Sequence, residues 1–327
     1  MTVFQSKELF LLTGAGFSKN CGGYLSDEMW AKIYNYPKLR TSANLLQLLR
    51  TNFDFEEVYA TVISAKSSFS EDDRKLLNEA IRSAYSSLDQ SEIDYLGSGD
   101  SHATQRLKRF IGEILHGSRD EKALWFTLNQ DLLVERMWDG QYRSLGVQAF
   151  GADIYQMRRA LAEHEFVKLS SNIDDATKGF GEAAQFHYLK LHGSIGWWTS
   201  YEESSTPQMV IGTSKEEFID KEPILKFYYN LFRTALNQGK KKLLIIGYGF
   251  RDEHVNRIIL DATRDKNAGL ELFVINSTKP KDFRRDHPEF WENMLGYFPY
   301  TFHELFPNRD QVEKPTQPLQ EVLDALK

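Results

Sequence analysis

The chain has a single cysteine, Cys21, among its 327 residues. One cysteine excludes an internal disulfide framework and a zinc site made of four cysteines, so we expect no metal and no zinc. Basic residues are not in excess either, because 40 Lys and Arg stand against 46 Asp and Glu, a net charge of -6. This balance gives no general attraction to nucleic acid, and direct sequence-specific nucleic-acid binding is not expected.

Long apolar runs are also missing. The strongest run, 243–246, is far shorter than the roughly 20 residues that a membrane helix requires. The N-terminus lacks the basic start and the long apolar stretch that are typical of a signal peptide. We therefore expect a cytoplasmic protein without a membrane segment, and its 41% hydrophobic residues are enough to build an ordinary core.

What the sequence does contain is a series of short, nearly continuous apolar runs bounded by turn residues. Such runs are typical of strands buried on both faces of a parallel sheet. Amphipathic stretches between them predict helices, and strands that alternate with helices predict an α/β fold with a doubly wound, mostly parallel Rossmann-like sheet. The predicted strands are 9–13, 124–127, 188–191, 243–246 and 270–275, and the intervening helices include 131–138, 154–163 and 252–263.

The segment from about 41 to 119 contains no convincing strand and is interpreted as an inserted helical subdomain. Four helices are predicted there, and Ser70 with Asp73 is typical of a capped helix start. These helices are 44–50, 55–65, 70–86 and 103–115. The enclosing domain is predicted to span residues 1–300, and an irregular segment at 169–185 is predicted to be a loop.

The C-terminal extension, 301–327, is predicted to carry a short terminal helix. Leu319, Val322, Leu323 and Leu326 fall on one face of that helix. This apolar face could dock on the chain's own domain or bind a partner, and the pattern alone leaves both open.

The first predicted strand runs directly into the turn Gly14, Ala15, Gly16, Phe17 and Ser18. Glycines after a buried strand let the backbone approach a ligand closely, and the next helix offers free N–H groups to a phosphate. A full dinucleotide fingerprint would need a third glycine where Lys19 stands, and no phosphate-binding G-x-x-x-x-G-K-S/T motif exists. Taken alone, these glycines could simply make a tight turn.

Polar side chains follow three further predicted strands. Asn129 and Asp131 end the second, His192 ends the third, and a segment beginning at Gly247 ends the fourth. Because the carboxyl ends of parallel strands line the crevice in which open α/β sheets bind ligands, we expect these segments to converge. The alternative for Asn129 and Asp131 is a helix cap, and for His192 a structural hydrogen bond.

In this order the segments resemble the sirtuin family, most of all the sirtuin-like NAD hydrolases of prokaryotic antiphage defence systems. That family has GAG-x-S after its first strand, then T-x-N-x-D, H-G, G-x-S/G-F and a strand that ends in I-N. The resemblance spans about residues 8–280 and leaves the helical insertion and the tail unmatched. The matching segments here are 14–18, 127–131, 192–193, 247–250 and 275–276.

The resemblance implies that NAD is the substrate and that its nicotinamide–ribose bond is cleaved. Asn129 would fix the ribose and the attacking water, Asp131 would grip the carboxamide, and His192 would be the general base. The turn would hold the pyrophosphate, and the later loops would line the adenosine side. The implied NAD-binding residues are Gly14, Ala15, Gly16, Phe17, Ser18, Thr127, Gly247, Tyr248, Gly249, Phe250, Asp252 and Asn276.

Protein-deacylating sirtuins carry a four-cysteine zinc module and a Pro-Asp-Phe-Arg-like stretch, and neither is present. Water is therefore the expected acceptor, which predicts an NAD glycohydrolase (NADase) that releases nicotinamide and ADP-ribose. The resemblance further implies an NAD-depleting effector of antiviral defence, a homo-oligomer, and a partner such as a HerA-like ATPase or a nucleic-acid sensor. The alternatives are a non-catalytic module that senses NAD or ADP-ribose, an NAD-dependent protein deacylase, and an ADP-ribosyltransferase.

Overall fold

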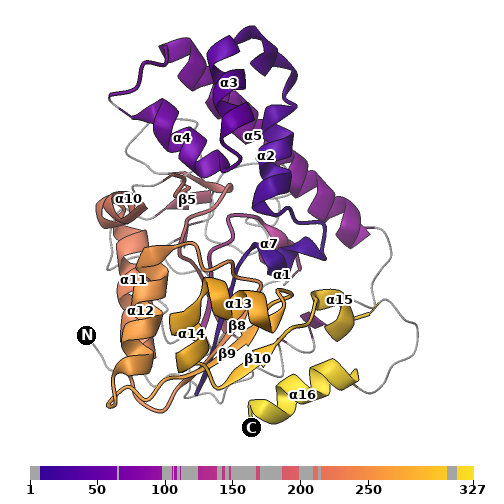
Figure 1. Ribbon diagram of the computed structural model, residues 1–327, viewed down its shortest axis with the longest axis vertical. Helices are drawn as coiled ribbons and strands as arrows, with labels where there is room; N and C mark the ends of the chain where they lie inside the picture. The colour runs from indigo at the N-terminus through magenta and orange to yellow at the C-terminus, as the bar shows by residue number, and fades with distance from the viewer. Residues whose placement is uncertain are drawn as a thin grey trace.

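The computed structural model describes residues 8–64, 66–97, 105, 107–108, 111, 124–137, 142–143, 147–148, 167–169, 186–198, 209–212, 215–307 and 315–327. Seven parallel strands form its central sheet, which confirms the predicted α/β fold (Figure 1). They are β1 (Leu9–Thr13), β2 (Leu124–Thr127), β3 (Tyr142–Arg143), β6 (Phe186–Lys190), β8 (Lys242–Ile246), β9 (Glu271–Ile275) and β10 (Gly296–Phe298). A separate three-stranded sheet joins β4 (Val147–Gln148), β5 (Val167–Leu169) and β7 (Trp197–Trp198).

The strand order is β10-β9-β8-β1-β2-β6-β3, with β1 at its centre. Leu11 of β1 pairs in register with Trp125 of β2 on one side and with Leu244 of β8 on the other. From β1 the chain proceeds outward in both directions, so the topological switch lies between β1 and β8. All five predicted strands are present, although β6 begins two residues before the predicted start. The short strand β10 was not predicted, because its mixed sequence Gly-Tyr-Phe has no strand periodicity.

Helices cover both faces of the sheet, and successive residues of β1 point into different cores. Phe10 and Leu12 pack in the core that includes α11 (Pro223–Leu236) and α12 (Glu253–Arg264), along with α13 (Pro280–Asp286) and α14 (Pro288–Asn293). Leu11 packs in the opposite core with α1 (Ala15–Lys19), α7 (Leu133–Met137), α15 (Phe302–Leu305) and α16 (Gln317–Ala325). This alternation is what two covered faces require.

The terminal helix α16 packs on the chain's own sheet domain. Val322 is fully buried in the same core as Phe298 and Phe302, and Leu319, Leu323 and Leu326 pack against that core. The predicted terminal helix is confirmed, and of the two readings left open for its apolar face the structure shows the intramolecular one.

Helices between residues 26 and 97 form a lobe beside the sheet, drawn in indigo and violet in Figure 1. Its own core joins Met29, Leu45, Val58 and Leu77. The Ser70 hydroxyl accepts from the amide of Asp73 at 3.1 Å, which confirms the predicted helix start. The helices are α2 (Ser26–Tyr34), the 3-10 helix η1 (Pro37–Thr41), α3 (Ala43–Thr51), α4 (Phe55–Ile63) and α5 (Glu71–Gly97).

Two boundaries of this helical lobe differ from the sequence prediction. The lobe starts with α2 rather than near residue 41. The prediction missed α2 because only two of its side chains, Met29 and Ile33, are buried apolar residues. Helix α5 continues past residue 86 to Gly97. The prediction ended too early because the buried face beyond residue 86 includes Asp89 and Glu92, which break the apolar pattern. The predicted helices 103–115 and 154–163 and the loop 169–185 lie largely outside the described residues. Among the described helices, none combines the length and apolar character needed to cross a bilayer.

Candidate functional site

The turn after β1 packs backbone to backbone against the loop after β8. The amide of Gly14 donates to Ile246 O at 3.0 Å, and the amide of Gly16 donates to Gly247 O at 2.8 Å. A Cβ on Gly16 would lie 2.8 Å from Gly247 Cα, and one on Gly247 would lie 2.3 Å from the amide nitrogen of Phe17. Both turns therefore need glycine for this contact alone. The pyrophosphate-binding role stays a prediction, and the amides of Gly14 and Gly16 already have carbonyl partners.

Three of the predicted site residues form one buried hydrogen-bonded group. Ser18 donates through its hydroxyl to Asp131 Oδ2 at 2.6 Å, and Asn129 Nδ2 donates to the same hydroxyl at 2.7 Å. Asp131 Oδ1 also accepts from the amide of Leu133 at the start of α7. Ser18 comes from α1, whereas Asn129 and Asp131 follow β2, so the pairing of β1 with β2 brings them together. The predicted convergence is thus observed for the segments that follow β1 and β2.

A buried ion pair between Lys190 and Glu135 lies next to this group. Lys190 of β6 is fully buried; it donates to the backbone carbonyl of Asp131, to Glu135 Oε1 at 2.6 Å and to Ser194 Oγ at 3.2 Å. Burial raises the pKa of Asp131, while the Lys190 charge and the Ser18 hydrogen bond oppose that rise. Lys190 therefore holds the backbone of the loop that carries Asp131, and its positive charge lies close to the Asp131 carboxylate.

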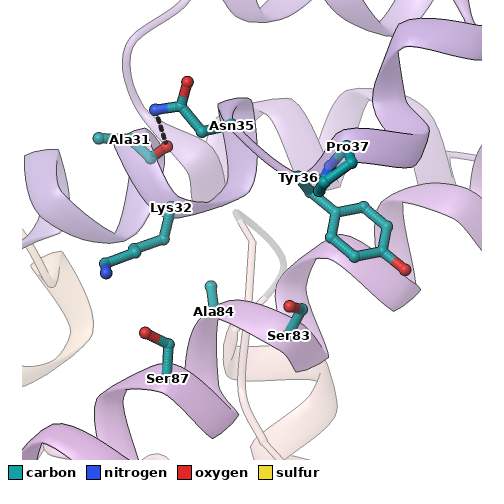
Figure 2. A pocket seen from close by; sticks show the side chains of 8 residues that line it. All are labelled: Ala31, Lys32, Asn35, Tyr36, Pro37, Ser83, Ala84 and Ser87. Atoms are coloured by element: carbon teal, nitrogen blue, oxygen red, sulfur yellow. Dashed lines mark hydrogen bonds between the residues drawn. The ribbon is translucent and has the colours of Figure 1, made fainter.

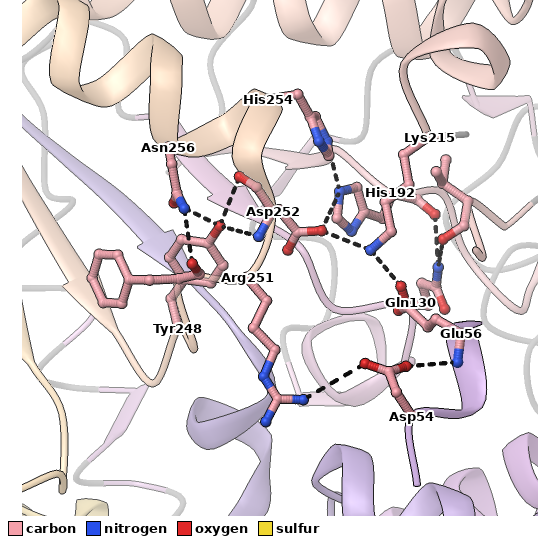
Figure 3. Close-up of polar contacts among 12 residues, drawn as sticks. Asp54, Glu56, Gln130, His192, Lys215, Tyr248, Arg251, Asp252, His254 and Asn256 are labelled. Atoms are coloured by element: carbon pink, nitrogen blue, oxygen red, sulfur yellow. Dashed lines mark hydrogen bonds and ion pairs between the residues drawn. The ribbon is translucent and has the colours of Figure 1, made fainter. Parts of the chain in front are cut away.

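His192 follows β6, the strand next to β2, and meets a second polar group from α12 and α11. Its Nε2 lies 3.3 Å from His254 Nε2 and 3.8 Å from Asp252 Oδ1 (Figure 3). His254 in turn shares a hydrogen bond of 2.9 Å with the Tyr229 hydroxyl. Asp252 was predicted from the sequence as an NAD-binding residue, and here its carboxylate lies beside the predicted base.

His192 is neutral in this environment. Burial lowers its pKa to about 3, an effect that Asp252 opposes and that Lys215 and His254 reinforce. A neutral imidazole has a free lone pair on one nitrogen that can accept a hydrogen bond or a proton, although so low a pKa makes it a weak base. The environment therefore keeps His192 in the proton-accepting form at neutral pH.

His192, Asp252 and His254 also present donor atoms within 4.8 Å of one another, a spacing that a divalent metal could use. The Asp252 Oδ1 atom, however, already contacts the ammonium of Lys215 at 2.6 Å. A resident cation at that oxygen would have to displace Lys215 and then sit beside its charge. In the arrangement described, Lys215 supplies the positive charge that the carboxylate requires.

The helical lobe reaches the same site at two places. Tyr85 of α5 donates through its hydroxyl to Gln130 Oε1, and Gln130 Nε2 donates to the backbone carbonyls of His192 at 3.1 Å and Val210 at 2.9 Å. Gln130 thus ties the loop that carries Asn129 and Asp131 to the loop that carries His192. The second contact is an ion pair between Glu56 of α4 and Lys215 at 2.6 Å.

The remaining predicted residues shape the loops around this centre. Thr127 Oγ1 accepts from the amide of Asn129 at 3.1 Å and so orients it. Asn276 Nδ2 donates to Tyr248 O at 3.0 Å, which joins the loops after β8 and β9. Phe17 packs edge-on against Trp125, and Phe250 packs against Phe283 and Phe290, so both are core residues. Ala15 is exposed, and Gly249 has open space around it.

A separate cavity lies away from these residues, between α2 and α5 of the helical lobe (Figure 2). Its volume is about 380 Å³, and Lys32, Asn35 and Tyr36 line one side of it. Ser83 and Ser87 of α5 face them across the cavity. None of the residues predicted from the sequence to bind NAD lies in its lining.

Residues 123–295 match the SIR2-like domain family, which is more than half of the chain. The chain belongs to this family. The match includes Asn129, Asp131, His192 and the loops after β8 and β9, whereas the turn at Gly14 precedes it. SIR2-like domains use NAD, so an NAD-related function follows. No curated protein matches the sequence.

Sequence reasoning missed several residues that the fold brings to this site. Lys215 and Glu56 are separated by more than 150 positions, and neither follows a predicted strand. His254 stands two residues after Asp252, and its position in the first turn of α12 was a signal that could have been used. Lys190 was given no role from the sequence, because a lysine in a strand gives no hint that it is fully buried.

Proposed function

We propose that this SIR2-like protein is an NAD glycohydrolase that cleaves the nicotinamide–ribose bond of NAD with water as the acceptor. The observation that carries the proposal is the buried Ser18–Asn129–Asp131 group at the carboxyl ends of β1 and β2, together with His192 after the adjacent strand β6. A carboxylate, an amide and a base held at neighbouring strand ends are what this reaction needs around a nicotinamide riboside.

The chemistry gives each residue a task. Breaking the C–N bond builds positive oxocarbenium character on the ribose while nicotinamide leaves as a neutral base. Asp131 would hold the carboxamide, and Asn129 would hold the ribose and the water on the face opposite the leaving group. As the water oxygen bonds to the anomeric carbon, its proton passes to His192. The products are nicotinamide, ADP-ribose and one proton, so the step balances without a further reactant.

The site's own hydrogen bonds favour controlled rather than constant activity. Asn129, Asp131 and His192 are 8%, 5% and 4% exposed, and Ser18 is bonded to both Asn129 and Asp131. NAD would have to replace these internal bonds when it enters. We therefore propose that assembly into a homo-oligomer or a partner protein, such as a HerA-like ATPase or a nucleic-acid sensor, opens the site. An NAD-depleting effector of antiphage defence in the cytoplasm would need such control, because constant activity would be toxic.

The test is to incubate the purified chain with NAD, alone and with the product of its neighbouring gene, and to quantify nicotinamide, ADP-ribose and acyl-peptide turnover. Nicotinamide release without an acyl acceptor supports hydrolysis. Asn129→Ala and His192→Ala should each lose at least about 99% of the activity, since positioned proton transfer contributes about 100-fold or more. The matched controls are Asn267→Ala and His303→Ala, which change exposed residues and should keep full activity.

Two results would redirect the proposal. NAD binding without nicotinamide release in any assembly would indicate a sensing module instead of an enzyme. Release that depends on an acylated peptide would indicate a deacylase, with water displaced as the acceptor.

A further inference from the structure

Lys215 links the helical lobe to the polar group around His192, and neither the sequence motifs nor the proposed reaction assigns it a role. It is the first residue of α10 (Lys215–Lys221). Its ammonium lies 2.6 Å from Glu56 Oε2 and 2.6 Å from Asp252 Oδ1, and the side chain is only 14% exposed. One cation thus bridges two carboxylates that come from different parts of the fold (Figure 3).

The two carboxylates would repel each other without this cation. Glu56 belongs to the first turn of α4 in the helical lobe, whereas Asp252 precedes α12 on the sheet domain. Ion pairs between exposed side chains contribute little, but removing one partner from a largely buried group leaves the other charges without compensation. A second contact at the same junction, between Asp54 and Arg251 at 4.0 Å, is more exposed and longer.

The bridge extends to His192 through Asp252. The Asp252 backbone amide donates to the Tyr248 hydroxyl at 3.1 Å, which fixes the residue from one side. Its carboxylate lies between the ammonium of Lys215 and Nε2 of His192, at 2.6 and 3.8 Å respectively. The same oxygen, Asp252 Oδ1, thus faces both side chains, and its shorter contact is with Lys215.

We propose that Lys215 is a positioning residue: by bridging Glu56 to Asp252 it holds the Asp252 carboxylate beside His192, so that the helical lobe completes the catalytic site. This inference rests on the proposed function for its effect on turnover, but not for its effect on His192 itself. The groups that face His192 are Asp252 and His254 on α12, with Lys215 on α10 and Glu56 on α4 behind Asp252. Tyr229 on α11 faces His254.

The experiment compares Lys215→Met with Lys215→Arg, Glu56→Gln and a control, Lys226→Met. Lys226 makes an exposed ion pair with Asp220 at 3.5 Å, so its substitution removes a lysine charge close in sequence but outside the bridge. Two quantities are measured: the titration of His192 by NMR of ring-labelled histidine, assigned with His192→Asn, and the pH profile of nicotinamide release. Thermal unfolding is recorded for every variant.

In the wild type we expect His192 to stay neutral throughout the pH range in which the protein is folded. Lys215→Met should free Asp252 to pair with the imidazole, so the His192 titration moves upward and the acid limb of the pH profile follows it. Turnover should fall about tenfold or more, a change mainly in kcat rather than in KM, because Lys215 is proposed to act through Asp252 on His192 and not on NAD. Lys215→Arg should restore most of the rate, Glu56→Gln should show a smaller loss, and Lys226→Met should match the wild type.

The inference is overturned if Lys215→Met lowers the melting temperature but leaves the His192 titration and the pH profile unchanged, since Lys215 would then only stabilise the fold. A Glu56→Gln variant identical to the wild type in both readouts would show that the helical lobe does not contribute to the site through Glu56. If the wild type releases no nicotinamide, the proposed function fails, but the NMR titration still tests whether Lys215 controls His192.

Discussion

The backbone of Gly16 lies directly against that of Gly247, with its amide 2.8 Å from the Gly247 carbonyl oxygen. This contact joins the turns that follow β1 and β8. Between these two strands lies the topological switch point, from which strands are added toward opposite edges of the sheet. The switch point is where open α/β sheets bind their ligands. The contact between the two glycine turns therefore lies at the place in the sheet where a ligand is expected to bind.

Gly247→Ala should destabilise the fold by about 2–4 kcal/mol. Gly247 has a φ of 64°, which a side chain disfavours, and its Cβ would lie 2.3 Å from the amide nitrogen of Phe17. Urea unfolding measures the change. Gly249→Ala is the matched control, because nothing lies within 4 Å of its Cβ position and the same segment is altered. If both variants have the same free energy of unfolding, the close contact between the two glycine turns does not contribute to stability.

Ser18→Ala should reduce nicotinamide release by about tenfold to a hundredfold. The hydroxyl donates to Asp131 and accepts from Asn129, so its loss frees both side chains from their present orientation. A hydrogen bond to a charged group contributes about 1.5–3 kcal/mol, which corresponds to that range of rates. Steady-state kinetics on purified protein provide the measurement, and Ser86→Ala on the exposed face of α5 is the control. An unchanged rate would show that the Ser18 hydroxyl plays no part in nicotinamide release.

Glu92→Gln should make the protein more stable at pH 8 and flatten its stability against pH. No described residue donates a hydrogen bond to either Glu92 carboxylate oxygen, and the side chain is fully buried. Burial, together with the nearby Asp131 and Asp89, raises its pKa well above 4.5. The folded protein therefore holds this proton more tightly than the unfolded chain does.

The sign follows from that difference. The stabilisation is complete below about pH 4.5 and is lost as pH rises through the folded-state pKa, with a slope of at most about 1.4 kcal/mol per pH unit. Chemical unfolding at several pH values should show a steeper slope in the wild type than in Glu92→Gln, in which other buried carboxyls such as Asp131 still contribute. Glu71→Gln, at the exposed start of the same helix, should behave like the wild type. An equal slope in the wild type and in Glu92→Gln would show that Glu92 does not contribute.

Lys190→Met should destabilise the fold by about 3–5 kcal/mol, because it leaves the buried Glu135 carboxylate without its partner. The double variant Lys190→Met with Glu135→Gln removes both charges and should recover part of that loss. Thermal and urea unfolding measure the stability of the wild type, the single variant and the double variant. If the double variant is less stable than the single one, the ion pair is not the source of the effect.

The layers of the fold and the polar strand ends could be predicted from the sequence. Runs such as Leu9–Thr13 are nearly continuous in apolar residues because both faces of the sheet are covered, and that pattern is visible without a structure. Asn129, Asp131 and His192 could be found because each directly follows such a run. Their convergence then depended only on the rule that parallel strands end at one edge of a sheet.

The rest depended on contacts that carry no local pattern. Lys215 begins a short helix, and Glu56 lies on another helix in the lobe, so nothing in either segment signals their ion pair. Asp89 and Glu92 made the buried face of α5 look polar, which shortened the predicted helix. The glycines after β1 were read as a ligand-binding turn, whereas the contact with Gly247 needs a partner more than 200 positions away.

The pairing of β1 also bears on how the protein is made. Its neighbours in the sheet are β2 and β8, and β8 begins at Lys242, more than two thirds of the way along the chain. A growing polypeptide on the ribosome therefore cannot bury β1 on both edges, or close the contact between Gly16 and Gly247, until most of the chain has emerged. A nascent or truncated chain that lacks β8 would thus also lack the contact that joins the two glycine turns of the site.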